Sequence, residues 1–219
     1  MARRMRQKLR ELPALRGPLP VFEPDAAPNE PVSLFGCWLD EAVAAGVPEP
    51  HAMTVSTVDQ QGEPSGRVVI LKGVDETGWS FASSRDSAKG TDLAHRPAAA
   101  LTFYWPIQGR QIRVRGAVSV GSPEQNAADF LARHPYSRAV VFSGRQSTPL
   151  ASRQALIEAL AAAQQGMSAN PERIAPEWTV YTVRADRVEF WQGHPCRLHT
   201  RLSYRRVSDT EWQRELLWP

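Results

Sequence analysis

The sequence has 219 residues, a formal net charge of +3 at pH 7 and a pI near 9.1, and 42% of its residues are hydrophobic, which is enough to bury a core. No apolar run approaches the ~18–20 residues that a membrane-spanning helix needs. The basic N-terminus is not followed by an apolar region, so we expect no signal peptide, no membrane association and a cytoplasmic protein.

Residues 1–28 are rich in Arg and Pro and show little periodicity, which predicts an extended N-terminal arm with at most a short helix at its start. The remaining residues, 29–219, are expected to form one domain. Its first helix is predicted over about 31–45, where Asn29 can cap the start and Gly46 ends it. The apolar face of this helix comprises Leu34, Phe35, Trp38, Leu39 and Ala42.

Beyond this helix the apolar pattern changes from a helical to an alternating period. Ser122 and Gln125 have the spacing of a capping box, which predicts a helix start. Residues 166–176 contain Gly, Ser, Asn and two prolines and predict an exposed loop. The predicted helices cover 88–95, 122–133 and 152–165, and the predicted strands cover 52–58, 67–71, 79–81, 98–105, 111–120, 178–183, 187–191, 197–207 and 212–217.

Strands dominate this pattern, several neighbouring strands are joined by short turns, and the helices are few and segregated. The sequence therefore predicts an α+β fold that is mainly antiparallel β, a sheet or barrel with peripheral helices. Cys37 and Cys196 lie far apart and the five histidines lack metal-ligand spacing, so we expect neither a disulfide nor a metal site. No phosphate-loop, dinucleotide-binding or hydrolase motif is present. The arginines are scattered singly, which favours local anion pockets over a nucleic-acid surface.

Two segments in the first half of the chain are candidates for binding an anion. Arg67 and Lys72 bracket four apolar residues on a predicted strand, and their odd spacing places them on opposite faces. Two solvated strand ends would have the same pattern. Residues 83–90 combine hydroxyl groups, Lys89 and a helix start, which suits a phosphate cradle, although a polar capped turn has the same composition.

Two further segments carry polar groups that a ligand could contact. Aromatic residues 103–105 are followed by alternating polar positions in 110–116, which predicts a strand with one face towards either a polar ligand or water. Gln146 and Ser147 supply hydrogen-bonding groups in a loop but indicate nothing alone. These segments gain weight only in combination with the others.

Arg197, His199 and Arg201 lie two residues apart, so on a predicted strand they share one face. Two cations and an imidazole directed to the same side are costly unless an anionic or electron-rich group lies opposite them. We therefore favour a functional interpretation of this stretch over a solvated strand face.

Together these stretches resemble the pyridoxamine 5′-phosphate oxidase family, a group of FMN-binding split-barrel enzymes, over residues 31–219. Each piece is weak alone, but their order and spacing in a chain of this length make a strong match. The pieces that carry the resemblance are 67–72, 103–105, 110–114, Gln146 with Ser147, 189–193, 197–199 and the C-terminal 212–219.

The resemblance implies a split β-barrel homodimer with two FMN sites at the subunit interface and a C-terminal dimerisation segment over about 176–219. It implies oxidation at the C4′ carbon of pyridoxamine or pyridoxine 5′-phosphate, with a hydride passing to flavin N5. Molecular oxygen then reoxidises the flavin and gives hydrogen peroxide. The flavin supplies the redox chemistry, and the protein supplies position and charge.

The resemblance also implies a role for particular residues. Arg197 and His199 would be the catalytic pair, orienting the small anionic substrate and stabilising charge near the reacting carbon. The substrate would contact Lys72, Arg133, Ser137, Arg197 and His199. FMN would be bound by Arg67, Val68, Val69, Ile70, Leu71, Lys72, Ser83, Lys89, Gln111, Gln146, Ser147, Trp191 and Arg201.

Three features depart from the family pattern. Ala88 stands where a basic residue usually lies beside Lys89. Asp129 stands where a Tyr usually helps to hold the substrate phosphate, and a carboxylate there repels a phosphate dianion unless it turns away or pairs with Arg133. The N-terminal arm lacks the Arg and Tyr pattern expected to close over the substrate.

Two alternatives to a vitamer-phosphate oxidase follow. One is an FMN-dependent oxidase of the same family that acts on another substrate, such as a dihydrophenazine carboxylate in secondary metabolism, which Asp129 and Ala88 motivate. The other is a flavin- or haem-binding split-barrel protein without oxidase turnover. The presence of both Arg197 and His199 argues against this carrier or sensor role.

Overall fold

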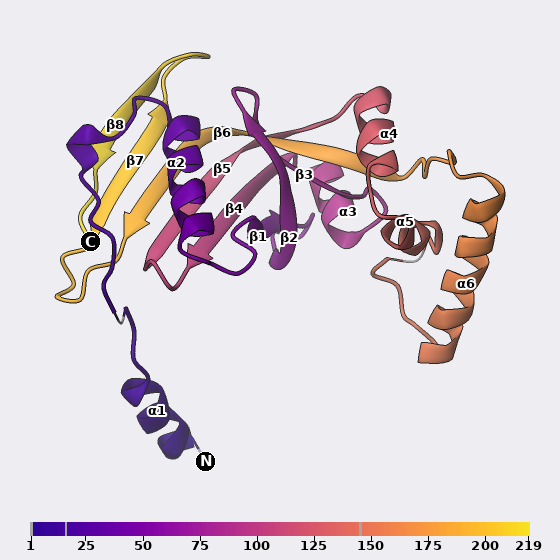
Figure 1. Ribbon diagram of the computed structural model, residues 1–219, viewed down its shortest axis with the longest axis horizontal. Coiled ribbons are helices and arrows are strands. Elements are labelled where there is room, and N and C mark those ends of the chain that lie inside the picture. Colours follow the sequence, from indigo (N-terminus) through magenta and orange to yellow (C-terminus); the bar gives the residue numbers. More distant parts are fainter. Residues whose placement is uncertain (1, 16, 145) are drawn as a thin grey trace. The chain divides into compact units, whose positions relative to one another are not determined.

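The computed structural model describes residues 2–15, 17–144 and 146–219 (Figure 1). The chain forms two compact units. The terminal unit contains Met1–His51, Thr102–Val114 and Arg187–Pro219, and the central unit contains Ala52–Leu101 and Arg115–Asp186. No helix in the described ranges is both long and apolar enough to cross a membrane.

The strands of the described chain form a sheet in the order β3-β2-β1-β4-β5-β6-β7-β8. A further pairing of β3 with β6 closes the first six of these into an antiparallel barrel, and β7 and β8 continue the sheet from β6. This arrangement confirms the α+β prediction of a mainly antiparallel barrel with helices around it. The strands are β1 Ala52–Val58, β2 Pro64–Asp75, β3 Gly78–Ser84, β4 Ala98–Trp105, β5 Arg110–Val120, β6 Trp178–Gln192, β7 Thr200–Arg206 and β8 Trp212–Leu216.

In the central unit, β2 and β3 pair along only part of their length. Their ladder runs from the Asp75–Gly78 pair to the Leu71–Phe81 pair, with a register shift between Leu71 and Gly73. Beyond Leu71, β2 continues to pair with β1, whereas the end of β3 continues to pair with β6. Among the strands that the structure describes, residues 67–70 therefore have a partner on one side only, and their other edge is open.

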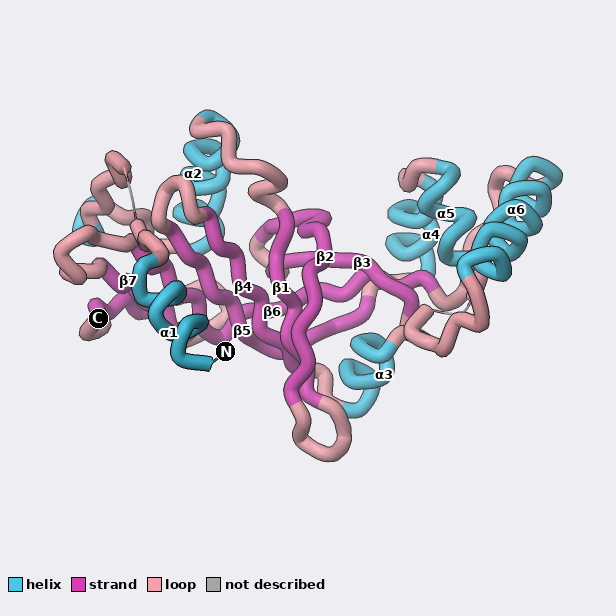
Figure 2. The backbone as a smooth tube through the Cα atoms, turned by 90° about the horizontal axis from the view of Figure 1, so that it is seen from below, coloured by secondary structure: helices cyan, strands magenta, loops and turns pink. Residues whose placement is uncertain are grey.

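The helices of the central unit are α3 Ala88–His95, α4 Pro123–Leu131, α5 Pro135–Phe142 and α6 Arg153–Ala169. Ser122 and Gln125 form the predicted capping box. The short α5 was not predicted, and the predicted loop 166–176 is wrong at its start because α6 continues to Ala169. Figures 1 and 2 both show α5 and α6 side by side.

The terminal unit contains α1 Ala2–Glu11, a 3₁₀ turn at Pro24–Ala26 and α2 Pro31–Ala44. The prediction that Asn29 caps α2 is wrong: because Pro31 is the first helical residue, the cap position is Glu30, which makes no side-chain cap bond. The apolar face of α2 packs as expected. The ring centroid of Trp38 lies 5.1 Å from that of Phe190 and 5.0 Å from that of Phe22.

β6 is one strand, although the sequence predicted two. It pairs with β3 over 178–183 and with β7 over 187–192, so its partner changes in the middle. Charged residues lie where the partner changes, and they interrupt the apolar pattern, which is why the sequence predicted two separate strands there. Gly116 lies against this part of β6, because a Cβ at that position would lie 2.0 Å from the carbonyl oxygen of Arg184.

Candidate functional site

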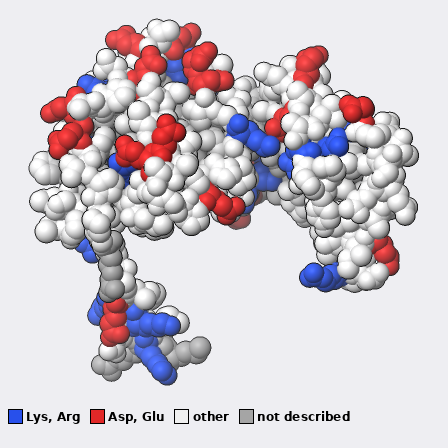
Figure 3. Space-filling view, in the orientation of Figure 1, with Lys and Arg blue, Asp and Glu red and all other residues white. Residues whose placement is uncertain are grey.

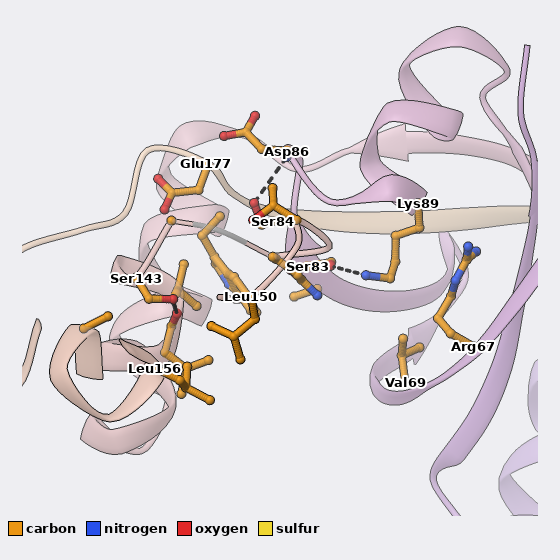
Figure 4. A pocket seen from close by; sticks show the side chains of 18 of the residues that line it. Arg67, Val69, Ser83, Ser84, Asp86, Lys89, Ser143, Leu150, Leu156 and Glu177 are labelled. Atoms are coloured by element: carbon orange, nitrogen blue, oxygen red, sulfur yellow. Dashed lines mark hydrogen bonds between the residues drawn. The ribbon is translucent and has the colours of Figure 1, made fainter. Parts of the chain in front are cut away.

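A cavity of about 790 Å³ lies in the central unit where β2 and β3 separate, and this volume is typical of a small-molecule site. The open edge of residues 67–70 forms one wall, and α5 and α6 contribute to another (Figure 4). Figure 3 shows Lys and Arg side chains on both sides of the hollow between the central-unit strands and helices. The cavity therefore combines an apolar surface with a cationic one.

Lys89 forms the buried centre of the cationic wall. The chain turns into α3 at Ser87, whose hydroxyl caps the helix by accepting a hydrogen bond from the backbone N–H of Gly90. Lys89 is only 7% exposed, and its Nζ donates to the Oγ atoms of Ser83 at 2.9 Å and Ser87 at 3.2 Å. Burial, and secondly the charge of Arg67, lowers the pKa of Lys89. An anion at this point would oppose both effects, because it stabilises the charged form of Lys89.

Arg67 reaches the same region from β2, and Figure 4 shows its side chain beside that of Lys89. Its guanidinium donates to the Oγ1 of Thr57 on β1 and lies 3.9 Å from the carboxylate of Asp92 on α3. Thr57 in turn donates a 2.6 Å hydrogen bond to Asp92. Sequence reasoning missed Thr57 and Asp92, because only the packing of α3 on β1 brings them to Arg67.

The start of α3 is closely packed. A Cβ at Gly90 would lie 2.2 Å from the carbonyl oxygen of Arg85, so no side chain fits there. Ala88, where the family usually has a basic residue, is exposed at the first helical position. The N–H groups at this helix start, together with the side chain of Lys89, are the donors that a phosphate group needs.

At the other end of the cavity, Lys72 and Asp129 form an ion pair, with 3.3 Å between Nζ and Oδ1. The other carboxylate oxygen of Asp129 accepts a 2.8 Å hydrogen bond from the indole Nε1 of Trp178. Arg133 stacks on the Trp178 ring at 4.0 Å from its centroid. Asp129 thus forms its ion pair with Lys72. The sequence alone had indicated Arg133 as the possible partner.

The wall on the helical side is apolar. It includes Val140 and Val141 of α5, Leu150 in the loop before α6, and Leu156 in the first turns of α6. Figure 4 shows Leu150 and Leu156 across from Arg67 and Lys89. These residues were not predicted as site residues, because α5 itself was not predicted. An apolar wall opposite cationic groups suits a flat ring system that carries an anionic tail.

The cavity brings together many of the predicted site residues. Arg67 and Lys72 lie on opposite faces of β2 by the alternation of burial, as expected, yet both line the cavity because it opens at the strand edge. Leu71, Ser137 and Ser147 are described but do not line it. The predicted residues that line it are Arg67, Val68, Val69, Ile70, Lys72, Ser83, Lys89, Arg133 and Gln146.

The remaining predicted residues belong to the terminal unit. The prediction that Arg197, His199 and Arg201 share one strand face is wrong, because β7 begins only at Thr200. Arg197 lies in a turn, with a φ of 65° and its N–H bonded to the carbonyl of His194 at 3.0 Å. A positive φ is uncommon outside glycine and marks a locally strained position.

His199 precedes β7 and stacks near Trp191 of β6, with 4.9 Å between ring centroids. Its Nδ1 accepts a 3.0 Å hydrogen bond from the backbone N–H of His194. Partial burial, and then the charges of Arg197 and His194, lowers the pKa of His199. At neutral pH the imidazole is therefore uncharged, and the proton lies on Nε2, which can donate to a ligand.

Arg201 already has a carboxylate partner in the structure. Its Nε donates to Glu189 at 2.9 Å, and its guanidinium also donates to the carbonyl of Trp218 at 2.7 Å. Glu189, only 5% exposed as a side chain, also pairs with Arg113 at 3.0 Å. The charge of Arg201 is thus balanced by Glu189, which sequence reasoning did not identify as its partner. Gln111, the other predicted cofactor residue here, lies half-buried on β5.

The fold and the cavity define a class: a closed antiparallel β-barrel protein with a cavity lined by cationic and apolar residues. A family model described as pyridoxamine 5′-phosphate oxidase matches residues 39–165. A second model, the pyridoxine 5′-phosphate oxidase C-terminal dimerisation region, matches residues 178–219. The chain belongs to the pyridoxamine 5′-phosphate oxidase family, and it is an oxidoreductase of that family.

Curated relatives support this membership over nearly the whole chain. The chain is 43% identical over 195 residues to a pyridoxine/pyridoxamine 5′-phosphate oxidase of Pseudomonas fluorescens, covering 88% of this chain and 90% of the relative. It is likewise 43% identical to a protein of the same name from Burkholderia lata, covering 86% and 87%. The matched C-terminal region supports homodimer formation.

Solved structures show the same fold. PhzG from Burkholderia lata, in complex with tetrahydrophenazine-1-carboxylic acid, matches with a TM-score of 0.85 and 30% identity, covering 93% of this chain and all of PhzG. A pyridoxamine 5′-phosphate oxidase-related, FMN-binding protein from Nostoc punctiforme matches with a TM-score of 0.68 at 18% identity. The second likeness concerns the fold alone. Family and fold together suggest a flavin cofactor.

Proposed function

We propose that this chain is an FMN-dependent oxidase that converts pyridoxamine or pyridoxine 5′-phosphate into pyridoxal 5′-phosphate, with molecular oxygen as the electron acceptor. The observation that carries the proposal is the buried Lys89, hydrogen-bonded to Ser83 and Ser87 beside Arg67 at an open strand edge. Lys89 and Arg67 repel each other when both are charged, and the negative charge of a mononucleotide phosphate between them would offset that repulsion.

The residues of the cavity fit FMN. Arg67, Ser83 and Lys89 would hold its phosphate, and residues 67–70 line the cavity beyond the end of the β2–β3 ladder. Gln146 lines the same cavity. When bound, FMN would supply the redox chemistry, since it accepts two electrons from a substrate and passes them to oxygen. Further proposed cofactor contacts are Leu71, Gln111, Ser147, Trp191 and Arg201, with the two FMN sites of the homodimer at the subunit interface.

Arg197 and His199 would act on the substrate. The exposed guanidinium of Arg197 sits on a strained turn that fixes its backbone, which favours a preorganised contact. The neutral His199 would donate from Nε2 to an oxygen or nitrogen of the substrate, while its Nδ1 remains bonded to His194. Lys72, Arg133 and Ser137 are proposed to contact the anionic tail of the substrate.

The reaction balances without a further reductant or oxidant. Oxidation of pyridoxine 5′-phosphate removes two electrons and two protons from its C4′ alcohol and leaves the aldehyde. With pyridoxamine 5′-phosphate the same oxidation gives an imine, and water then releases ammonia. In both cases oxygen takes up the two electrons and two protons as hydrogen peroxide. The names of the relatives at 43% identity support these substrates.

A second candidate keeps FMN but changes the substrate to a reduced aromatic carboxylate, such as a dihydrophenazine carboxylate. Two observations favour it. PhzG, solved with tetrahydrophenazine-1-carboxylic acid, has the same fold at 30% identity. In addition, the Lys72–Asp129 ion pair leaves fewer free cations for a phosphate than Lys72 and Arg133 alone would offer.

The test is an anaerobic titration of the purified protein with pyridoxamine 5′-phosphate, followed in the visible spectrum. Bands of bound flavin that bleach on addition, and return with oxygen and peroxide, would support the oxidase and this substrate together. Bands that do not bleach would favour the second candidate, to be titrated with a dihydrophenazine carboxylate. Flavin that no reductant of either class bleaches would indicate a carrier, and a protein that takes up no FMN contradicts the proposal.

A further inference from the structure

The charged groups at the Lys72 end of the cavity form one connected cluster. Both carboxylate oxygens of Asp129 are engaged: Oδ1 lies 3.3 Å from the Nζ of Lys72, and Oδ2 accepts the indole N–H of Trp178 at 2.8 Å. The side chain of Asp129 is 19% exposed and that of Lys72 is 34% exposed. The indole therefore fixes the carboxylate in the position where it neutralises the lysine.

Arg133 supplies the second cation of this cluster. Arg133 stacks on Trp178, the residue whose indole donates to Asp129, with its guanidinium carbon 4.0 Å from the ring centroid. It also donates a hydrogen bond to the carbonyl of Ser137 at 3.3 Å. Its Nε is buried and has no hydrogen-bond partner among the described residues. Arg133 and Lys72 both line the cavity, so both cations are placed to act on a ligand there.

The charges at this end decide which anions it can neutralise. Lys72 and Arg133 carry one positive charge each, and Asp129 carries one negative charge, so the cluster has a net charge of +1. A carboxylate or a phosphate monoanion matches that charge. A phosphate ester near pH 7 carries about −1.5 to −2 and would lie beside the carboxylate of Asp129, where like charges repel.

We propose that Asp129 is a specificity-determining residue that makes this end of the cavity select a singly charged substrate anion over a dianion. The proposal rests on the oxidase function above and names the charge class of its substrate. A substrate whose anionic group is a carboxylate is bound as it is, and a phosphate ester is bound as its monoanion. Asp129 does not itself line the cavity; it acts through Lys72, which does and lies 3.3 Å from its carboxylate.

The test compares two anions of similar size on the FMN-loaded protein, in which the Lys89 end is occupied. Phenyl phosphate and benzoate are titrated by calorimetry at pH 8, so the measurement does not depend on turnover. In the wild type we expect benzoate to bind at least as tightly as phenyl phosphate. Asp129→Asn keeps a hydrogen-bond acceptor for Trp178 and removes the charge, and it should shift the preference towards phenyl phosphate by roughly tenfold or more.

Two controls separate this effect from general changes in charge or fold. Glu158→Gln removes one carboxylate from an exposed position of α6 outside the cavity and should leave the preference unchanged. Lowering the pH of the wild type from 8 to 6 protonates phenyl phosphate, whose second pKa is about 6, but not benzoate. It should tighten phenyl phosphate binding relative to benzoate without any substitution.

An unchanged preference in Asp129→Asn, together with no gain for phenyl phosphate at pH 6, overturns the proposal. In that case, flavin that still bleaches with pyridoxamine 5′-phosphate leaves the oxidase function standing while this inference fails. A protein that takes up no FMN fails both. The visible spectrum therefore tests the oxidase function separately from the calorimetric test of Asp129.

Discussion

Asp92 accepts a 2.6 Å hydrogen bond from the hydroxyl of Thr57, and this bond joins α3 to β1 beneath the cationic wall of the cavity. Thr57 accepts in turn from Arg67, whose guanidinium lies 3.9 Å from the Asp92 carboxylate. Asp92 does not itself line the cavity. It therefore acts as a positioning residue that orients Arg67 through Thr57 and by charge.

We expect Asp92→Asn to weaken FMN binding by about tenfold, because Arg67 loses its charged partner and its orientation becomes less fixed. Quenching of FMN fluorescence on binding measures the dissociation constant. Activity at saturating FMN should stay within a few-fold of wild type. An Asp92→Asn protein that binds FMN as tightly as wild type would show that Thr57 alone orients Arg67.

Lys89→Ala and Arg197→Ala should have opposite signatures. Lys89→Ala removes a buried donor from the proposed phosphate site and should raise the FMN dissociation constant by about 10- to 100-fold, with turnover restored when FMN is added in excess. Arg197→Ala should reduce turnover much more than FMN content. Flavin content per chain and activity with added FMN separate the two. If Arg197→Ala loses flavin in proportion to activity, Arg197 is a cofactor residue.

Gly90→Ala should disrupt the start of α3, because its Cβ would lie 2.2 Å from the backbone carbonyl of Arg85. The backbone must move, and we expect flavin retention to fall together with thermal stability. Gly36→Ala in α2 is the matched control, since a Cβ there meets nothing within 4 Å. It should stabilise the protein by about 0.5–1 kcal/mol through helix propensity. Thermal unfolding with and without FMN measures both changes.

The activity should fall at acid pH as His199 takes up a proton. Protonation places a hydrogen on Nδ1, where the His194 N–H already donates, and charges the ring beside Arg197. Because the pKa of His199 is lowered from 6.5, the acid limb of kcat/KM should lie below pH 6.5. His194→Gln removes one of the causes and should move the limb to higher pH. A limb that persists unchanged in His199→Asn belongs to another group.

Glu189→Gln should destabilise the fold of the terminal unit. The substitution keeps the shape but removes the buried charge shared by Arg113 and Arg201, and we expect a loss of about 1–3 kcal/mol in the free energy of unfolding. Glu215→Gln is the comparison, because its pair with Arg187 is more exposed and should contribute within about 0.5 kcal/mol. Denaturant unfolding at fixed protein concentration measures both, and equal losses would contradict the expected role of burial.

Local signals were sufficient for much of the secondary structure. The predicted bounds of 88–95 and 98–105 match α3 and β4, and the capping box at Ser122 begins α4, because caps and apolar periods act over a few residues. The same local reasoning failed where tertiary pairing decides. β6 is continuous because two different strands pair with its two halves, and Arg197 lies in a turn that alternation alone cannot foresee.

By itself the sequence determined the family, the barrel class and the cationic residues on one wall of the cavity, since these depend on the order of motifs along the chain. Only the tertiary structure decided how the charges pair. Asp129 meets Lys72, Glu189 meets Arg201, and Asp92 meets Thr57 and Arg67. These partners lie on different elements, and which ones meet depends on packing and register, so no local pattern in the sequence records them.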